Sequence, residues 1–258
     1  MTDQRDHLSQ ILLAEDPTNG LWELVDSGLA AEIVPELPAL ALEQDPIHKH
    51  KDVLAHSIAV TAKTRADLVL RLSALFHDIG KPRTRRIDAE LGVTFRHHEA
   101  VGAKMTNKRL VALDFDEQIV TDVTELVRLS GRFKGFASGW SDSAVRRYAR
   151  DAGHLLGTLN ELVRSDCTTR NERKRQELHH HVDVLEERIA ELAEQDRRAA
   201  ERPLLDGAAV MARFDVSPGP SVGKALKFLL ELKRAEPSLD IAATEERLDL
   251  WWKDHTGT

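Results

Sequence analysis

Two histidines and an aspartate stand where the chain could hold a metal ion. His56 ends the segment Asp52-Val53-Leu54-Ala55-His56. His77 and Asp78 directly follow the apolar run 74–76. Since His77 and Asp78 come where a predicted helix leaves the core, these polar groups need a partner. A divalent cation is one partner, because imidazole nitrogens and carboxylate oxygens satisfy it together and leave positions for water. A bare His-Asp pair is also compatible with an ion pair or a helix-terminal hydrogen bond.

Helices are the elements that must position these residues. Apolar residues recur at helical spacing along most of the chain, for example in segments 68–79 and 178–192. The best segment with a period of two is the short stretch 93–95, which we interpret as an extended connector. Gly80 is predicted to take the left-handed conformation that ends a helix, and Pro82 to prevent the continuation of that helix. The sequence therefore predicts an all-α fold.

Proline and glycine clusters divide the chain into four predicted parts. We expect an N-terminal helical segment over 1–43 and a helical bundle over 44–171 that carries the metal residues. A charged connecting helix over 172–201 leads into a C-terminal helical tail over 202–258. The joins contain no Gly/Ser-rich linker, so we expect these parts to pack on one another.

Composition excludes several classes of protein. The 258 residues carry a formal charge of -7, so no global basic field attracts nucleic acid. The single cysteine, Cys167, excludes an intrachain disulfide and an all-cysteine zinc site, which fits a reducing compartment such as the cytoplasm. No apolar run approaches the ~20 residues needed to cross a bilayer, and no membrane partner is expected.

A distal aspartate completes a recognisable pattern. Asp166 lies in segment 160–171, within a predicted helix and far along the chain from His56 and from the segment His77-Asp78-Ile79-Gly80-Lys81. This order of residues resembles the HD superfamily of metal-dependent phosphohydrolases. The resemblance implies an HD-domain core with helical extensions, in which His56, His77, Asp78 and Asp166 bind one divalent ion. Mixed nitrogen and oxygen ligands accept Mn, Fe, Ni, Zn or Mg.

A second metal is implied for many members of that superfamily, where two further histidines hold it. His98 fits the first of these positions better than its neighbour His97. Ser130 and Lys134 stand where similar proteins have histidine, and a hydroxyl and an ammonium do not replace two imidazoles. We therefore expect a single metal, with His97 and His98 as second-metal or substrate residues.

A closer resemblance extends over nearly the whole chain. Its main segments are 12–22, 43–56, 142–148, 167–173 and 218–223, which occur in the expected order. The chain resembles the C-terminal portion of bacterial, actinobacterial-type CCA-adding tRNA nucleotidyltransferases. The N-terminal nucleotidyltransferase domain of those enzymes has no counterpart here, so CCA addition by this chain alone is not expected. The resemblance implies phosphoester hydrolysis at the HD metal and contact with tRNA.

The catalytic hypothesis assigns two roles within the site. Asp78 would bind the metal and orient a water that attacks phosphorus, and Lys81 would stabilise negative charge on the phosphate. The expected substrates, taken from the resemblance, are cyclic or terminal phosphates on nucleotides or RNA. Two alternatives remain: a non-catalytic tRNA-binding body that works with a separate nucleotidyltransferase, and a triphosphohydrolase of nucleotides.

Basic residues outside the site form the candidate RNA-binding set. Arg146 and Arg147 lie within one predicted turn, and Arg170 begins another basic run. Lys224 follows the segment 218–223, which opens a helix with free backbone N–H groups that could hold a phosphate. A solvated charged face and a plain helix-capping turn explain these features equally well.

Overall fold

Short acidic side chains fix the starts of the two helices that flank the site. In a computed structural model, the carboxylates of Asp52 and Asp67 accept hydrogen bonds from backbone N–H groups two and three residues further on, at 2.7 and 2.9 Å. They cap α4 (Val53–Lys63) and α5 (Leu68–Phe76). Each such cap stabilises its helix by about 1 kcal/mol.

The structure describes residues 2–42, 52–88, 92–169 and 171–256. Over these residues the all-α prediction is confirmed, since a two-stranded hairpin is the only sheet that they form. The helices are α1 (Thr2–Leu13), α2 (Thr18–Asp26), α3 (Leu29–Ile33), α4, α5, α6 (Lys81–Thr84), α7 (His98–Ala112), α8 (Glu117–Leu129), α9 (Asp142–Ala152), α10 (Leu156–Asp166), α11 (Glu172–Ala200), α12 (Gly207–Phe214), α13 (Pro220–Ala235) and α14 (Ile241–Thr256), with short 3₁₀ helices η1 (Pro38–Leu40), η2 (Arg132–Ser138) and η3 (Gly153–Leu155).

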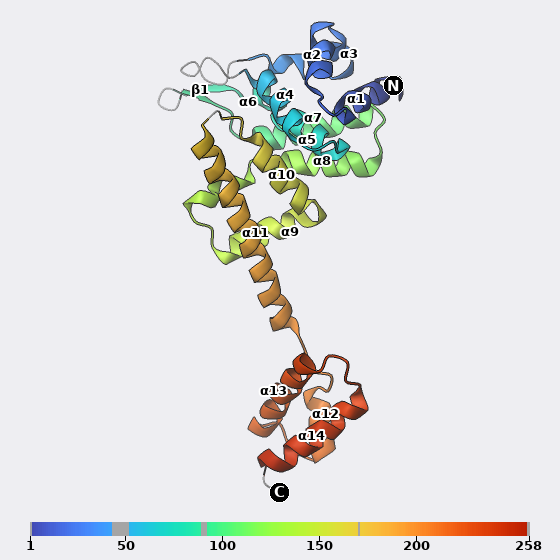
Figure 1. The fold of residues 1–258 in the computed structure, drawn as a ribbon, viewed down its shortest axis with the longest axis vertical. Helices are drawn as coiled ribbons and strands as arrows, with labels where there is room; N and C mark the ends of the chain where they lie inside the picture. The colour runs from blue at the N-terminus through green and yellow to red at the C-terminus, as the bar shows by residue number, and fades with distance from the viewer. Residues whose placement is uncertain (1, 43–51, 89–91, 170, 257–258) are drawn as a thin grey trace. The chain divides into compact units, whose positions relative to one another are not determined.

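The chain forms two compact units, residues 1–190 and residues 191–258. In the first unit, helices α1 to α5, α7 and α8 surround one apolar core, which includes Leu12, Leu72, Phe76 and Val123 (Figure 1). A smaller cluster of Val60, Leu70, Ala74 and Leu162 joins α4, α5 and α10. This cluster packs the three helices against one another.

A β-hairpin leaves the bundle between α6 and α7. Its strands are β1 (Arg86–Asp88) and β2 (Gly92–Thr94), which pair antiparallel with Ile87 opposite Val93. The extended segment predicted at 93–95 therefore corresponds mainly to β2. Strand β1 was not predicted from the sequence.

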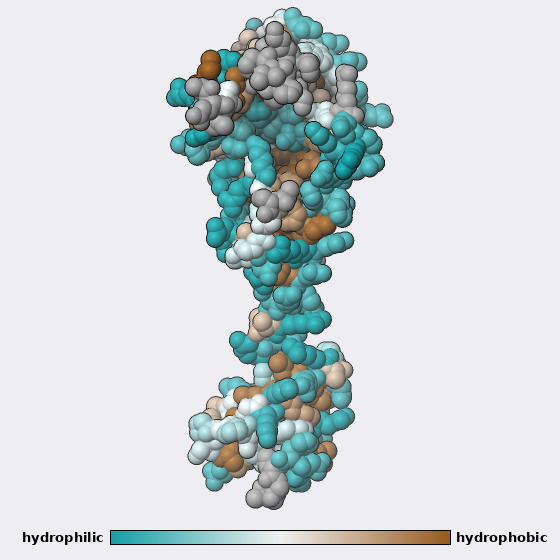
Figure 2. Space-filling view, turned by 90° about the vertical axis from the view of Figure 1, so that its left-hand side faces the viewer, coloured by the Kyte–Doolittle hydropathy of each residue, from teal (hydrophilic) through white to brown (hydrophobic). Residues whose placement is uncertain are grey.

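The second unit packs α12, α13 and α14 through stacked aromatic rings. The rings of Phe214 and Trp252 lie parallel with centroids 4.1 Å apart, and those of Phe228 and Trp251 are 5.1 Å apart. Figure 2 shows a mainly hydrophilic face on which this unit also carries apolar patches. Among the described residues, every helix is too short or too polar to cross a membrane.

One buried arginine donates hydrogen bonds to backbone carbonyls at the ends of two helices. Arg71 of α5 is 2 % exposed, and its guanidinium donates to the backbone carbonyls of Leu12, Ala14, Glu15 and Thr64. These carbonyls lie at or just beyond the ends of α1 and α4. A charged donor that satisfies several buried acceptors is costly to remove, because the acceptors lose their partners.

We expect Arg71→Met to lower the free energy of unfolding by about 3–5 kcal/mol, because the methionine fills the space but leaves the four carbonyls unsatisfied. Urea unfolding followed by circular dichroism measures the change. Arg150→Met is the matched control, since its side chain is 73 % exposed, and it should change stability by less than about 0.5 kcal/mol. Equal stability of the two variants would show that Arg71 is not structural.

Candidate metal centre

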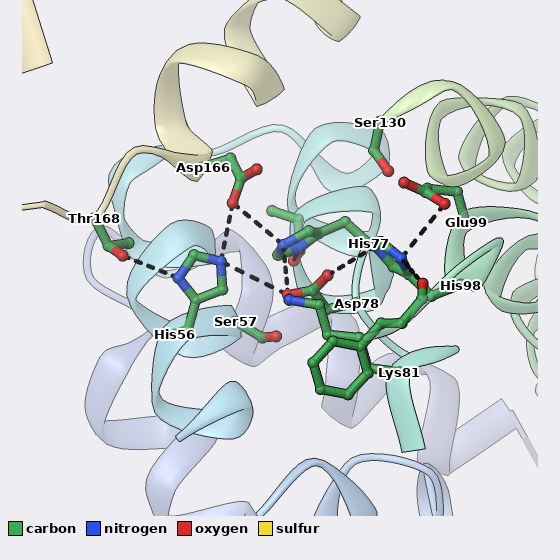
Figure 3. Close-up of polar contacts among 12 residues, drawn as sticks. His56, Ser57, His77, Asp78, Lys81, His98, Glu99, Ser130, Asp166 and Thr168 are labelled. Atoms are coloured by element: carbon green, nitrogen blue, oxygen red, sulfur yellow. Dashed lines mark hydrogen bonds and ion pairs between the residues drawn. The ribbon is translucent and has the colours of Figure 1, made fainter. Parts of the chain in front are cut away.

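The four residues predicted to bind metal come from three helices, α4, α5 and α10. His56 lies on α4, His77 and Asp78 directly follow α5, and Asp166 is the last residue of α10 (Figure 3). The apolar cluster that joins these helices sets their packing, and the polar side chains project beyond it. Residues far apart in sequence are thereby placed within reach of one ion.

The ligand atoms lie close together. His56 Nε2 is 2.9 Å and His77 Nε2 is 3.4 Å from the same Asp166 oxygen, Oδ1. One ligand atom from each of these three residues falls within 4.8 Å of the other two. Asp78 adjoins them, with Oδ2 at 3.2 Å from His77 Nε2 and 3.7 Å from His56 Nε2. The structure therefore brings together all four residues.

Hydrogen bonds behind the imidazoles orient them toward the carboxylates. His77 Nδ1 donates to the Ala74 carbonyl at 2.7 Å, and His56 Nδ1 lies 2.9 Å from the Thr168 hydroxyl. Since a carbonyl can only accept, the proton of a neutral His77 ring is on Nδ1 and its Nε2 carries a lone pair. Partners of this kind fix the orientation of metal-binding histidines in many proteins. The sequence offered no signal for Thr168 beyond its place two residues after Asp166.

The surroundings of the buried His77 Nε2 indicate whether a cation fits between the candidate metal residues. Among the described residues it has no hydrogen-bond partner, although the oxygens of Asp78 and Asp166 stand at 3.2 and 3.4 Å. A lone pair that faces two carboxylates is stable only if a positive charge lies between them, either a proton or a metal ion. The donor set, two imidazoles and two carboxylates, fits a divalent metal.

The charges around His77 set the protonation of the site. Burial alone lowers the pKa of His77, but the adjacent Asp78 carboxylate and then Asp166 outweigh it and raise the pKa to about 10. Burial raises the pKa of Asp78, yet His77, His98 and Lys81 hold it well below its ordinary value. Asp166 is likewise held low by His56 and His77, against its burial. Without metal, the centre holds a proton on His77 and two ionised carboxylates.

We expect metal affinity to rise with pH for this reason. A metal must displace the His77 proton, so each unit of pH between about 6 and 9, below the raised pKa, should tighten binding about tenfold. The carboxylates are already ionised in this range and add nothing to the slope. Calorimetry in two buffers of different ionisation enthalpy should find about one proton released per ion at neutral pH. An affinity that is independent of pH would contradict this protonation scheme.

Lys81 brings a cation to the same site. Its Nζ donates to Asp78 Oδ2 at 2.6 Å and lies 5.6 Å from the centre of the Phe95 ring. A cavity of about 270 Å³ opens above the metal residues. Its lining residues are His56, His77, Asp78, Lys81, His98, Ser130, Gly131, Lys134, Asp166, Cys167, Thr168 and Thr169. The cavity is large enough for one phosphate group and part of its substituent.

The two histidines considered for one second-metal position, His97 and His98, differ in where their side chains lie. His98 lines the cavity, with Nε2 at 3.4 Å from Asp78 Oδ1 and Nδ1 at 2.8 Å from the Phe95 carbonyl. His97 is exposed, caps α7 with a left-handed φ of 62°, and does not line the cavity. His98 is thus the one of the pair that faces the candidate metal residues.

Ser130 and Lys134 have other partners where a second metal would need ligands. The Ser130 hydroxyl donates to the Val127 carbonyl at 2.9 Å, and Lys134 Nζ is 3.4 Å from Glu99 Oε1. Glu99, which the sequence did not single out, also approaches His98 Nδ1 with its second oxygen at 3.4 Å. Burial raises the pKa of Glu99, but its own backbone N–H, His98 and Lys134 lower it overall.

Gly80 is required here for a reason that differs from the predicted one. Its φ of -79° is right-handed, so the prediction of a left-handed helix end is wrong. A Cβ at position 80 would lie 2.1 Å from the carbonyl oxygen of His98 and 2.7 Å from the backbone nitrogen of Gly102. Glycine therefore allows α7 to approach the His77-Asp78 turn. Pro82 stands at the start of α6, where proline is well tolerated.

The residues predicted to bind RNA lie outside the cavity. Arg146 and Arg147 are on α9 of the first unit, where Arg147 is exposed. Lys224 is exposed on α13 of the second unit. Arg170 lies outside the described residues. None of the three described residues lines the metal cavity, so their assignment remains a prediction.

Comparison with known proteins identifies the family. Residues 53–217 match the HD domain. The A-adding tRNA nucleotidyltransferase of Deinococcus radiodurans is 32 % identical over 236 residues, which cover 89 % of this chain and 53 % of that protein. The CC-adding tRNA nucleotidyltransferase of Thermus thermophilus is 33 % identical over 260 residues, covering 96 % and 56 %. The multifunctional CCA protein of Pseudomonas aeruginosa is 29 % identical over 131 residues, covering 49 % and 30 %.

The chain spans about half the length of the first two relatives. Both resemblances inferred from the sequence, to HD proteins and to the HD-containing portion of CCA-adding enzymes, are confirmed by these matches. The chain belongs to the HD domain family.

Proposed function

We propose that the protein is a metal-dependent phosphohydrolase that acts on a cyclic or terminal phosphoester of a nucleotide or RNA. The observation that supports this most directly is the buried Nε2 of His77, which faces two carboxylates without a hydrogen-bond partner among the described residues. That arrangement needs a cation, and it lies at the floor of an open cavity lined by further cationic groups.

His56, His77, Asp78 and Asp166 would hold the ion. A divalent metal bound there supplies an activated water and polarises a phosphoester oxygen. The metal is one of Mn, Fe, Ni, Zn or Mg, since the mixed ligand set accepts each of them. We propose one metal per chain, because Ser130 and Lys134 offer no imidazole.

The remaining cavity residues would bind the substrate. Lys81 projects into the cavity beside Asp78, where its ammonium can pair with a phosphate oxygen and stabilise charge that develops there. Lys134 lies at the rim with a side chain 68 % exposed, free to turn from Glu99 toward an anion. Thr168 keeps the ring of His56 in place. These groups recognise a phosphate rather than a particular base.

A substrate screen tests the proposal. Protein stripped of metal and reloaded with each candidate ion is assayed with 2′,3′-cyclic nucleotides, 3′-phosphorylated oligoribonucleotides and deoxynucleoside triphosphates. We expect hydrolysis of the first or second class that requires one particular ion and is abolished by chelation. Release of inorganic triphosphate from the third class would instead identify a triphosphohydrolase. No turnover with any ion would contradict the proposed function.

The second candidate function is a non-catalytic RNA-binding body. It is favoured by the similarity to A-adding and CC-adding tRNA nucleotidyltransferases and by the absence of the histidines at 130 and 134. In that case Arg146, Arg147, Arg170 and Lys224 are candidates for contacts with tRNA phosphates. Salt-dependent tRNA binding without turnover in the screen would favour this second function.

A further inference from the structure

A set of exposed arginines surrounds the β-hairpin beside the metal cavity. They are Arg83 on α6, Arg85 and Arg86 at the start of the hairpin, and Arg96 after its end. We call residues 83–88 and 92–96 the arginine hairpin. Among the described residues, none of these four guanidinium groups has an ion-pair or hydrogen-bond partner.

These arginines differ from most others in the protein. Arg109, Arg164 and Arg213, for example, each pair with a carboxylate of another segment at 2.8 Å or less. Unpaired guanidinium groups in a chain with a net charge of -7 form a local positive surface that has to be explained on its own. Ile87, at the middle of β1, is 80 % exposed and is the most exposed large apolar side chain described.

The hairpin segment starts two residues after a residue that lines the metal cavity. Lys81, two residues before the hairpin segment, lines the cavity and lies 5.6 Å from the ring centre of Phe95 near its other end. The Phe95 carbonyl in turn accepts from His98 Nδ1 at 2.8 Å. A strand held by the arginines would therefore have its end next to Lys81 and the candidate metal residues.

We propose that the arginine hairpin binds the sugar-phosphate backbone of a single-stranded RNA end and holds its terminal phosphate at the cavity. Guanidinium groups pair with successive phosphates, and the exposed side chain of Ile87 covers the apolar face of a base or ribose. A cavity of about 270 Å³ admits a strand end but no duplex, which favours an unpaired terminus. The placement at the cavity rests on the proposed hydrolytic function, whereas the RNA contact does not.

Binding of a short fluorescein-labelled oligouridylate with a 3′-hydroxyl end tests the contact, because this probe has no terminal phosphate to hydrolyse. We expect Arg85→Gln/Arg86→Gln to raise the Kd for this oligonucleotide about tenfold at physiological salt. The slope of log Kd against log salt should fall by about 1.4, since each lost phosphate contact on a single strand contributes about 0.7. Arg83→Gln/Arg96→Gln should have a similar effect.

Arg197→Gln/Arg198→Gln is the matched control. It removes the same charge from exposed residues of α11 that already pair with Glu194, and it should change Kd by less than about twofold. Equal losses in the hairpin and control variants, or binding like the wild type in the hairpin variants, would overturn the inference. So would lost binding to phosphatidylserine vesicles with RNA binding retained, which would identify a lipid surface as the partner.

The two proposals can fail separately. If the substrate screen finds no turnover while the hairpin variants lose RNA binding, the RNA contact stands and the hydrolytic function does not. If turnover is found while the hairpin variants bind RNA like the wild type, the RNA contact is excluded and the metal centre stands.

Discussion

His77→Ala is expected to lose the divalent metal and all metal-dependent phosphoester hydrolysis. His77 Nε2 is a buried candidate ligand atom, and the hydrogen bond from Nδ1 of the same ring to the Ala74 carbonyl fixes its direction. Loss of an outer partner of a metal ligand lowers affinity about 10–100-fold, so loss of the ligand itself should lower it by more than about 100-fold. Metal content after dialysis and hydrolysis rate measure the two effects.

Because a buried histidine also contributes to the stability of the fold, a second variant separates metal binding from that structural role. Asp166→Asn keeps the size and one oxygen of the side chain but removes the charge that faces His56 and His77. It should lose metal and activity with a native circular dichroism spectrum. His180→Ala, on the exposed face of α11, is the control and should retain both. Full activity in either His77→Ala or Asp166→Asn would exclude the proposed centre.

Among substitutions that add a single methyl group near the site, Gly80→Ala is expected to lower the free energy of unfolding most. The new Cβ would meet two backbone atoms of α7, His98 O at 2.1 Å and Gly102 N at 2.7 Å, and backbone cannot turn aside as a side-chain end can. The start of α7 must therefore move away from the turn that carries Asp78. We expect a loss of about 3 kcal/mol in the free energy of unfolding, the upper end for overpacking, together with weaker metal binding.

Gly157→Ala is the matched control for that substitution. Gly157 lies inside α10, and a Cβ there would meet no atom within 4 Å. Replacing a helical glycine with alanine should stabilise the protein by about 0.5–1 kcal/mol. Urea unfolding of both variants compares them directly. If Gly80→Ala were as stable as the wild type, the close approach of α7 to the site would be wrong.

The helices were predictable from sequence because their signals are local. Apolar periodicity indicated α5 and the middle of α11. The conformation of Gly80 was predicted wrongly, since a glycine after a helix suggests a left-handed residue. Its actual role depends on α7, which follows eighteen residues later and whose approach no local pattern reveals.

The candidate site was only partly predictable for the same reason. The His-Asp pair and the resemblance to HD enzymes pointed to His56, His77, Asp78 and Asp166, which the structure places together. Thr168 and Glu99 were missed, because a hydroxyl or a carboxylate becomes a partner of a histidine only through tertiary packing. The hairpin arginines carried no motif. Their lack of ionic partners is visible only once the described side chains are placed.

Titration of the metal-free protein with Mn²⁺ tests the central claim most directly. If His56, His77, Asp78 and Asp166 form one centre, calorimetry should find one ion bound per chain, with about one proton released at neutral pH. The same titration of Asp166→Asn should show no tight site. Two tight ions per chain would contradict the single-metal assignment. No binding by the wild type, or equal binding by Asp166→Asn, would contradict the metal centre itself.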